Sequence, residues 1–172
     1  MQQSVRFLTA LAATFLASSP LVAGDLTFSR APSFDERVTI VEVGSTLNDA
    51  SDWDYWFKRT IRRGKLDEVW WTDTTHCPAA RWVVENAINL TPPVIEVPGI
   101  KGKDQGDDIV VTADGALYEL TSGARYGENI GSQISFSSNV GTPLANWADE
   151  SLRRLDPCWS KERSSLVPKG EY

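Results

Sequence analysis

The dipeptide His76-Cys77 stands where the sequence predicts the start of a helix, and its residue types could do chemistry. A cysteine at a helix N-terminus can be held as a thiolate by the helix dipole, and several hydrolases place their nucleophile there. The chain has a single histidine, however, and it is the residue adjacent to Cys77. Because neighbouring side chains normally point in different directions, the spacing argues against a Cys–His catalytic pair.

Cys158 offers Cys77 a different role, because these two are the only cysteines of the chain. In an oxidising compartment an even pair of cysteines is most simply a disulfide. The sequence separation is 158 − 77 = 81 positions. Chain-entropy reasoning for such a loop gives about 4–5 kcal/mol as an upper figure for the stabilisation. We predict a Cys77–Cys158 disulfide and assign no catalytic residue.

Residues 1–24 have the pattern of a secretory signal peptide. Arg6 precedes an apolar stretch that is too short to span a bilayer, and small residues follow before Asp25. We expect cleavage after Ala23 or Gly24 and a secreted or periplasmic protein. The alternative is a buried N-terminal helix.

Removing 24 of the 172 residues leaves 148, which suits one domain with its own core. We expect this domain at 25–159 and a flexible tail at 160–172. Without Arg6, 16 basic residues remain against 23 acidic ones, a net charge of −7 that argues against nucleic-acid binding. The sequence has no second long apolar run, so we expect no membrane span in the mature chain.

Residue periodicity divides the mature chain into helices and strands. A stripe of Trp53, Trp56, Phe57, Thr60 and Ile61 at helical spacing predicts a first helix. The predicted helices are 49–63, 78–91 and 143–155. Runs rich in β-branched and aromatic residues predict strands, and residues 25–36 form an extended arm or a short edge strand. The predicted strands are 37–43, 66–72, 109–112, 116–120 and 132–138.

This order of elements predicts an α+β fold. We expect a two-layer sandwich with an antiparallel or mixed sheet of about five strands, three helices and one disulfide. The hairpin signal at Ala113-Asp114-Gly115 argues against a continuous parallel sheet.

The sequence contains no recognisable metal-binding or cofactor-binding motif. His76 with Asp73 offers too few ligands at too irregular a spacing. Three acids of a Gly-rich loop (Asp104, Asp107 and Asp108) do not match a calcium-binding loop. The sequence has no Gly-x-Ser-x-Gly, phosphate-loop or dinucleotide fingerprint. We therefore expect no metal and no cofactor.

The residues around the predicted disulfide are the candidate binding site. Tryptophans 70, 71 and 159 could shield the disulfide or form an aromatic platform. On the exposed rim we name Asp73, His76, Arg81 and Trp82. These features favour a non-enzymatic binding or interaction module of the cell envelope, with a protein, peptide or glycan partner. The alternative is a small extracytoplasmic hydrolase that uses Cys77 or a pair of acidic residues.

Overall fold

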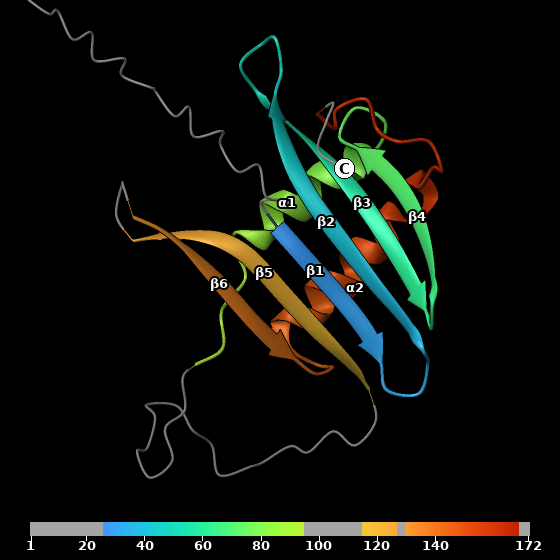
Figure 1. The fold of residues 1–172 in the computed structure, drawn as a ribbon. Coiled ribbons are helices and arrows are strands. Elements are labelled where there is room, and N and C mark those ends of the chain that lie inside the picture. The colour runs from blue at the N-terminus through green and yellow to red at the C-terminus, as the bar shows by residue number, and fades with distance from the viewer. Residues whose placement is uncertain (1–25, 95–114, 127–129, 169–172) are drawn as a thin grey trace, which may run out of the picture.

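A six-stranded antiparallel sheet forms one layer of the protein, and two helices cover one of its faces (Figure 1). The computed structural model describes residues 26–94, 115–126 and 130–168. The strand order is β4-β3-β2-β1-β5-β6. The elements are β1 (Leu26–Pro32), β2 (Arg37–Leu47), β3 (Trp53–Arg63), β4 (Leu66–Asp73), α1 (Pro78–Ala87), β5 (Ala116–Tyr126), β6 (Ile130–Ser138), α2 (Pro143–Leu155) and the 3₁₀ turn η1 (Asp156–Cys158).

The expected fold of about five strands and three helices is wrong. The sheet has six strands, all pairings are antiparallel, and two helices accompany it in the described residues. The first predicted helix, 49–63, is in fact strand β3, which pairs with β2 and β4. Gly64, at a φ of 59°, belongs to the hairpin turn between β3 and β4, where the left-handed backbone favours glycine.

Burial on both faces explains why β3 resembles a helix in sequence. Phe57 points toward the helices and is fully buried. Trp56 points to the opposite face, yet it is 1% exposed because it packs on Gly44 and Trp71. A strand buried on both faces loses the alternation of apolar and polar residues that normally identifies it. The spacing of Trp56, Phe57 and Thr60 then also matches a helical stripe.

The last helix matches its predicted bounds, whereas the N-terminal segment of the domain does not have its expected place in the sheet. The last helix has the expected bounds, Pro143–Leu155, and its N-cap Thr142 accepts a hydrogen bond from the Ala145 N–H at 3.2 Å. The expected arm or edge strand at 25–36 contains β1, which lies inside the sheet between β2 and β5. The predicted signal peptide 1–24 and the predicted strand 109–112 lie outside the described residues. None of the described helices is long and apolar enough to cross a membrane.

The core lies between the sheet and the two helices. Phe28 of β1 meets Trp147 of α2 edge to face, with ring centroids 4.8 Å apart. The Trp147 Nε1–H donates to the Val83 carbonyl of α1 at 3.2 Å, so the buried indole keeps its hydrogen bond while tying the helices together. Burial of such large apolar side chains is the main force holding helices and sheet together.

The described part of the C-terminal tail is packed rather than free. Ser160 pairs with Trp71 at the β4 edge through two backbone hydrogen bonds of 2.7 and 2.9 Å. The chain then runs over the face of the sheet opposite the helices, where Ser164 and Val167 are buried. The Leu166 carbonyl accepts a hydrogen bond from the Thr46 hydroxyl at 3.0 Å. Residues 160–168, the tail segment, therefore close one end of the outer face.

The contact between Gly44 and Trp56 gives a first testable prediction. A Cβ atom at residue 44 would lie 2.2 Å from Cζ2 of the buried Trp56 ring, which has no room to move. We expect Gly44→Ala to lower the free energy of unfolding by about 1–3 kcal/mol. Gly123→Ala is the matched control, because a Cβ there meets nothing within 4 Å. Urea unfolding measures both, and equal stability of the two variants would contradict the packing described.

Candidate functional site

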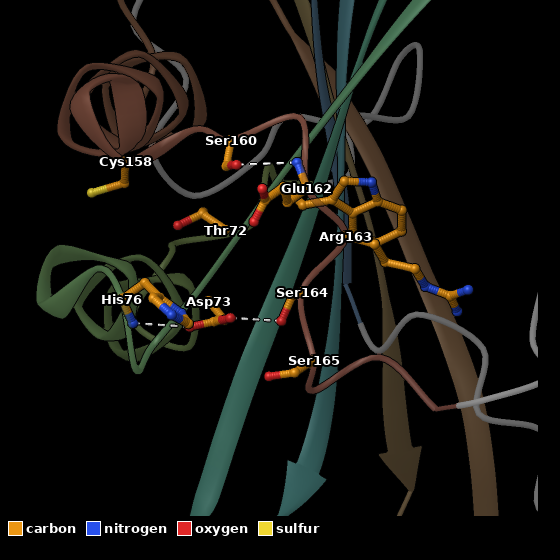
Figure 2. Close-up of a pocket in the computed structure, with 10 residues that line it drawn as sticks. Thr72, Asp73, His76, Cys158, Ser160, Glu162, Arg163, Ser164 and Ser165 are labelled. Carbon is orange, nitrogen blue, oxygen red and sulfur yellow. Dashed lines mark hydrogen bonds and ion pairs between the residues drawn. The ribbon is translucent and has the colours of Figure 1, made fainter.

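A cavity of about 410 Å³ lies between the start of α1, the β4 edge and the tail segment, and we name it the tail pocket (Figure 2). It contains two of the four residues that the sequence suggested for binding, Asp73 and His76. Its lining also includes Trp71, Thr72, Cys158, Ser160, Glu162, Arg163, Ser164 and Ser165.

The Asp73 carboxylate is the centre of the tail pocket. Figure 2 shows it between His76 on one side and Ser164 on the other. Its Oδ2 accepts from the Ser164 hydroxyl at 2.6 Å, and its Oδ1 is 2.7 Å from Nδ1 of His76. Oδ1 also accepts from the Thr75 hydroxyl at 2.6 Å and from the backbone N–H groups of Thr75 and His76 at 3.0 and 2.9 Å. One buried side chain thus joins the end of β4, the turn into α1 and the tail segment.

These hydrogen bonds fix the charge state of Asp73. Burial by itself would raise the carboxyl pKa, because a charged group loses hydration in the interior. Hydrogen bonds from Ser164, Thr75 and His76 oppose that effect and bring the pKa of Asp73 down to about 2. The group is therefore a carboxylate at neutral pH, where it acts as a hydrogen-bond acceptor.

Serine, histidine and aspartate meet here, but their order is not that of a catalytic triad. In a triad the histidine lies between the serine and the aspartate, so that it can take the serine proton. Here Asp73 lies between Ser164 and His76, and the Ser164 hydroxyl donates to the carboxylate. The arrangement secures two chain segments and does not activate a serine nucleophile.

The structure contains the predicted disulfide between Cys77 and Cys158, with Cα atoms 5.7 Å apart. Cys77 is the N-cap residue of α1, and Cys158 ends η1. A sulfur atom in a disulfide is not a thiolate, so Cys77 cannot act as the proposed hydrolase nucleophile while the bond is intact. A disulfide is also typical of oxidising, extracytoplasmic compartments.

The other two suggested residues, Arg81 and Trp82, lie on α1 away from the tail pocket. Arg81 donates to the Trp53 carbonyl at 3.1 Å and lies 3.5 Å from an Asp54 carboxylate oxygen. The Trp82 ring is covered by the Arg154 guanidinium, 4.2 Å from its centroid. The tail pocket therefore includes two of the four suggested residues, and Arg81 and Trp82 are outside its lining.

Cationic side chains also cover the tryptophans near the disulfide. The Arg59 guanidinium lies 4.6 Å from the Trp159 centroid and 5.5 Å from that of Trp70. Lys161 lies 3.8 Å from the Trp70 centroid. Cation–π contacts of this kind stabilise the packing of the tail segment. The ring faces of Trp70 and Trp159 that these cations contact are therefore not available to a ligand.

An apolar groove of about 340 Å³ lies elsewhere, between the end of α1 and strands β1, β5 and β6. Its lining is aliphatic and aromatic, with one hydroxyl from Ser122. The lining residues are Leu26, Val84, Ala87, Ile88, Leu90, Pro92, Leu120, Ser122, Gly123, Ile134 and Phe136. Ile88 and Ile134 are both exposed, so the apolar surface reaches solvent. An apolar concavity of this size is the usual form of a binding site.

The groove is bordered by the free edge of the sheet. Strand β6 pairs with β5, and within the described residues no strand pairs with its other side. Its sequence, Ile-Gly-Ser-Gln-Ile-Ser-Phe-Ser-Ser, has neither a charged residue nor a proline. The opposite edge differs, because β4 carries Asp67 and Glu68 and is paired in part by Ser160.

Strand β6 was predicted from the sequence as a strand, but its position at the edge of the sheet was not. The signal was present, since a strand without charge or proline lacks the usual protection of a sheet edge. This signal does not reveal an edge strand by itself, because the position of a strand in a sheet depends on its pairing with segments distant in sequence. The candidate calcium ligands Asp104, Asp107 and Asp108 lie outside the described residues. Among the described residues, no group of three or more acidic, histidine or cysteine side chains could hold a metal ion.

Comparison of the chain with protein-family models, with curated proteins and with solved structures gives no match.

The depressed pKa of Asp73 predicts how stability changes in acid. A group whose pKa is lower in the folded state stabilises the fold above its unfolded pKa and loses that contribution as pH falls. With an ordinary value of 3.8 and a folded value of about 2, the loss falls between about pH 4 and pH 2. We expect Asp73→Asn to lower the free energy of unfolding by about 2 kcal/mol at pH 7 and to flatten its dependence on pH in that window.

The matched control is Asp67→Asn, an exposed carboxylate of the same strand that pairs with Arg62 at 3.2 Å. Its effect should stay below about 1 kcal/mol, because exposed ion pairs contribute little. Urea unfolding between pH 2 and pH 7 measures both variants. An Asp73→Asn protein as stable as the Asp67→Asn protein would show that the carboxylate does not hold the tail segment.

The disulfide gives a separate prediction. Cys77→Ser and Cys158→Ser should lower the melting temperature equally, because each breaks the same bond. The loss should not exceed about 4–5 kcal/mol for a sequence separation of 81. Thiol titration of the unreduced protein should find no free cysteine. A reactive Cys77, or an effect confined to one variant, would contradict a structural role.

Proposed function

We propose that the protein is a non-enzymatic interaction module that works outside the cytoplasm and binds its partner by strand addition at β6. The observation that carries this proposal is the uncharged edge of β6, which no strand of the described residues pairs with, beside the apolar groove. The disulfide supports an extracytoplasmic setting, as does the signal peptide predicted at residues 1–24.

The backbone of β6 supplies the hydrogen bonds that do not depend on the partner's sequence. In an antiparallel sheet, alternate residues of an edge strand direct their N–H and C=O groups away from the sheet. Soluble proteins usually protect such an edge with charge, proline, a bulge or a covering segment. The β4 edge has acidic residues and a covering segment, whereas β6 has no charge and no proline. The contrast favours β6 as the edge kept for a partner.

The apolar groove supplies the contacts that select the partner's side chains. Ile134 and Phe136 lie on the helix-facing side of β6, opposite Ser122 and Leu120 of β5, and all four residues line the groove. Alternate side chains of an added strand would point to this same side. A partner segment with apolar residues at alternate positions could therefore bury them beside Ile134 and Phe136. Backbone pairing combined with pockets for alternate side chains is an established mode of peptide recognition.

A charge placed on the β6 edge tests the proposal. Ser135 lies on the outer side of β6, and its hydroxyl contacts that of Thr121 on β5 at 3.0 Å. We expect Ser135→Lys to reduce the polypeptides captured from an envelope or secreted extract by the immobilised protein. A lysine on an edge strand hinders the addition of another strand.

Thr121→Lys is the matched control, because it adds the same charge to the same side and breaks the same hydroxyl contact, but on an interior strand. It should keep the captured polypeptides, which mass spectrometry identifies. Hydrogen exchange should show slower exchange of β6 amides in the captured complex. Equal capture by both variants, or unchanged exchange in β6, would refute strand addition.

A further inference from the structure

We infer that the strand added at β6 comes from a second copy of the same chain, so that the protein forms a symmetric dimer through antiparallel β6–β6 pairing. This inference rests on the proposed function, because it names the partner of the same edge. The alternative occupants of the β6 edge are other peptides, which the experiment below distinguishes from a second copy.

Charge is the first argument for a second copy. The chain is acidic, with 23 Asp and Glu residues against 17 Lys and Arg residues. An acidic surface of this chain would therefore favour a basic partner. The nine residues of β6 contain no charged side chain. Two identical copies can therefore pair along β6 without placing like charges opposite one another, which would destabilise the contact. The edge also offers no acidic residue to attract a basic peptide.

Register is the second argument. A two-fold axis beside Ile134 would place Ile134 opposite the second copy's Ile134, and Phe136 opposite its Ser132. Directly opposed side chains share one face of an antiparallel sheet, here the helix-facing side. The exposed Ile134, at 40% of its accessible surface, would then be covered by its own counterpart. The apolar linings of the two grooves would meet along this seam.

The opposite edge of the sheet explains why pairing would stop at two copies. A β6 strand that added to β4 instead would make a head-to-tail contact, which can extend into an open filament. Ser160 already occupies part of the β4 edge through its two hydrogen bonds with Trp71. With β4 obstructed, β6–β6 pairing is the contact that closes on itself. Its two-fold symmetry leaves the tail segments at the two outer ends.

Charge complementation at residue 134 tests the dimer. The full mature protein is studied by sedimentation velocity and equilibrium, with its disulfide intact. We expect the wild type to be a dimer and both Ile134→Lys and Ile134→Glu to dissociate at least about tenfold more readily, because like charges then face each other. Mixing the two variants should restore a dimer, since lysine then faces glutamate.

Leu117→Lys is the control, because Leu117 is similarly exposed, at 47% against 40% for Ile134, but lies on the interior strand β5. It should remain dimeric, and circular dichroism confirms that each variant is folded. A wild type that is monomeric at about 100 μM would overturn the inference. So would dissociation of the Leu117→Lys protein, or mixed variants that stay monomeric.

The two proposals can fail separately. A monomeric wild type whose capture of other polypeptides is still lost on Ser135→Lys overturns the second-copy partner and leaves strand addition in place. A dimer that is unaffected by both Ser135→Lys and the residue-134 charges also overturns the second-copy partner, because its interface then lies elsewhere. Strand addition itself is overturned when the Ser135→Lys and Thr121→Lys proteins capture the same polypeptides.

Discussion

The buried carboxylate of Asp73 is the interaction on which the arrangement of this end of the protein depends. It accepts hydrogen bonds from the turn that begins α1 and from Ser164 of the tail segment, and the Asp73 backbone carbonyl accepts from the Cys77 N–H at 2.9 Å. A buried charge is tolerated when hydrogen bonds replace its lost hydration. The disulfide of Cys77 ties the same turn to the end of α2, so a covalent bond and an ionised acceptor hold one junction together.

This junction gives the two edges of the sheet opposite properties. At β4, the secured tail segment pairs with the strand, and Trp56 of the neighbouring strand β3 is buried on the outer face. The cations Arg59 and Lys161 lie against tryptophan rings near this edge. At β6, the described residues provide no such cover, and the strand lies beside an apolar groove. The asymmetry is the physical basis for placing the interaction surface at β6.

Strand β3 shows why part of the fold could not be predicted. Helix prediction relied on the spacing of Trp56, Phe57 and Thr60, but these residues are buried on opposite faces of the sheet. Trp56 packs on Gly44 of β2 and Trp71 of β4, which belong to two other strands. Periodicity assumes one buried face, and it fails when distant segments cover both. Arg81 and Trp82 were grouped with Asp73 by proximity in sequence, whereas the lining of the tail pocket includes Asp73 and His76 but neither Arg81 nor Trp82.

The sequence by itself determined features that depend on local chemistry. The bounds of α2 follow from the Thr142 cap, Pro143 and an apolar stripe, and the Cys77–Cys158 bond follows from cysteine count. Tertiary structure alone decided which strands lie at the edges, that Asp73 is a saturated acceptor rather than an open ligand, and that an apolar groove adjoins an uncharged β6. These features arise from pairing between segments far apart in the chain. No local pattern encodes them, because strand order and burial are properties of the assembled sheet.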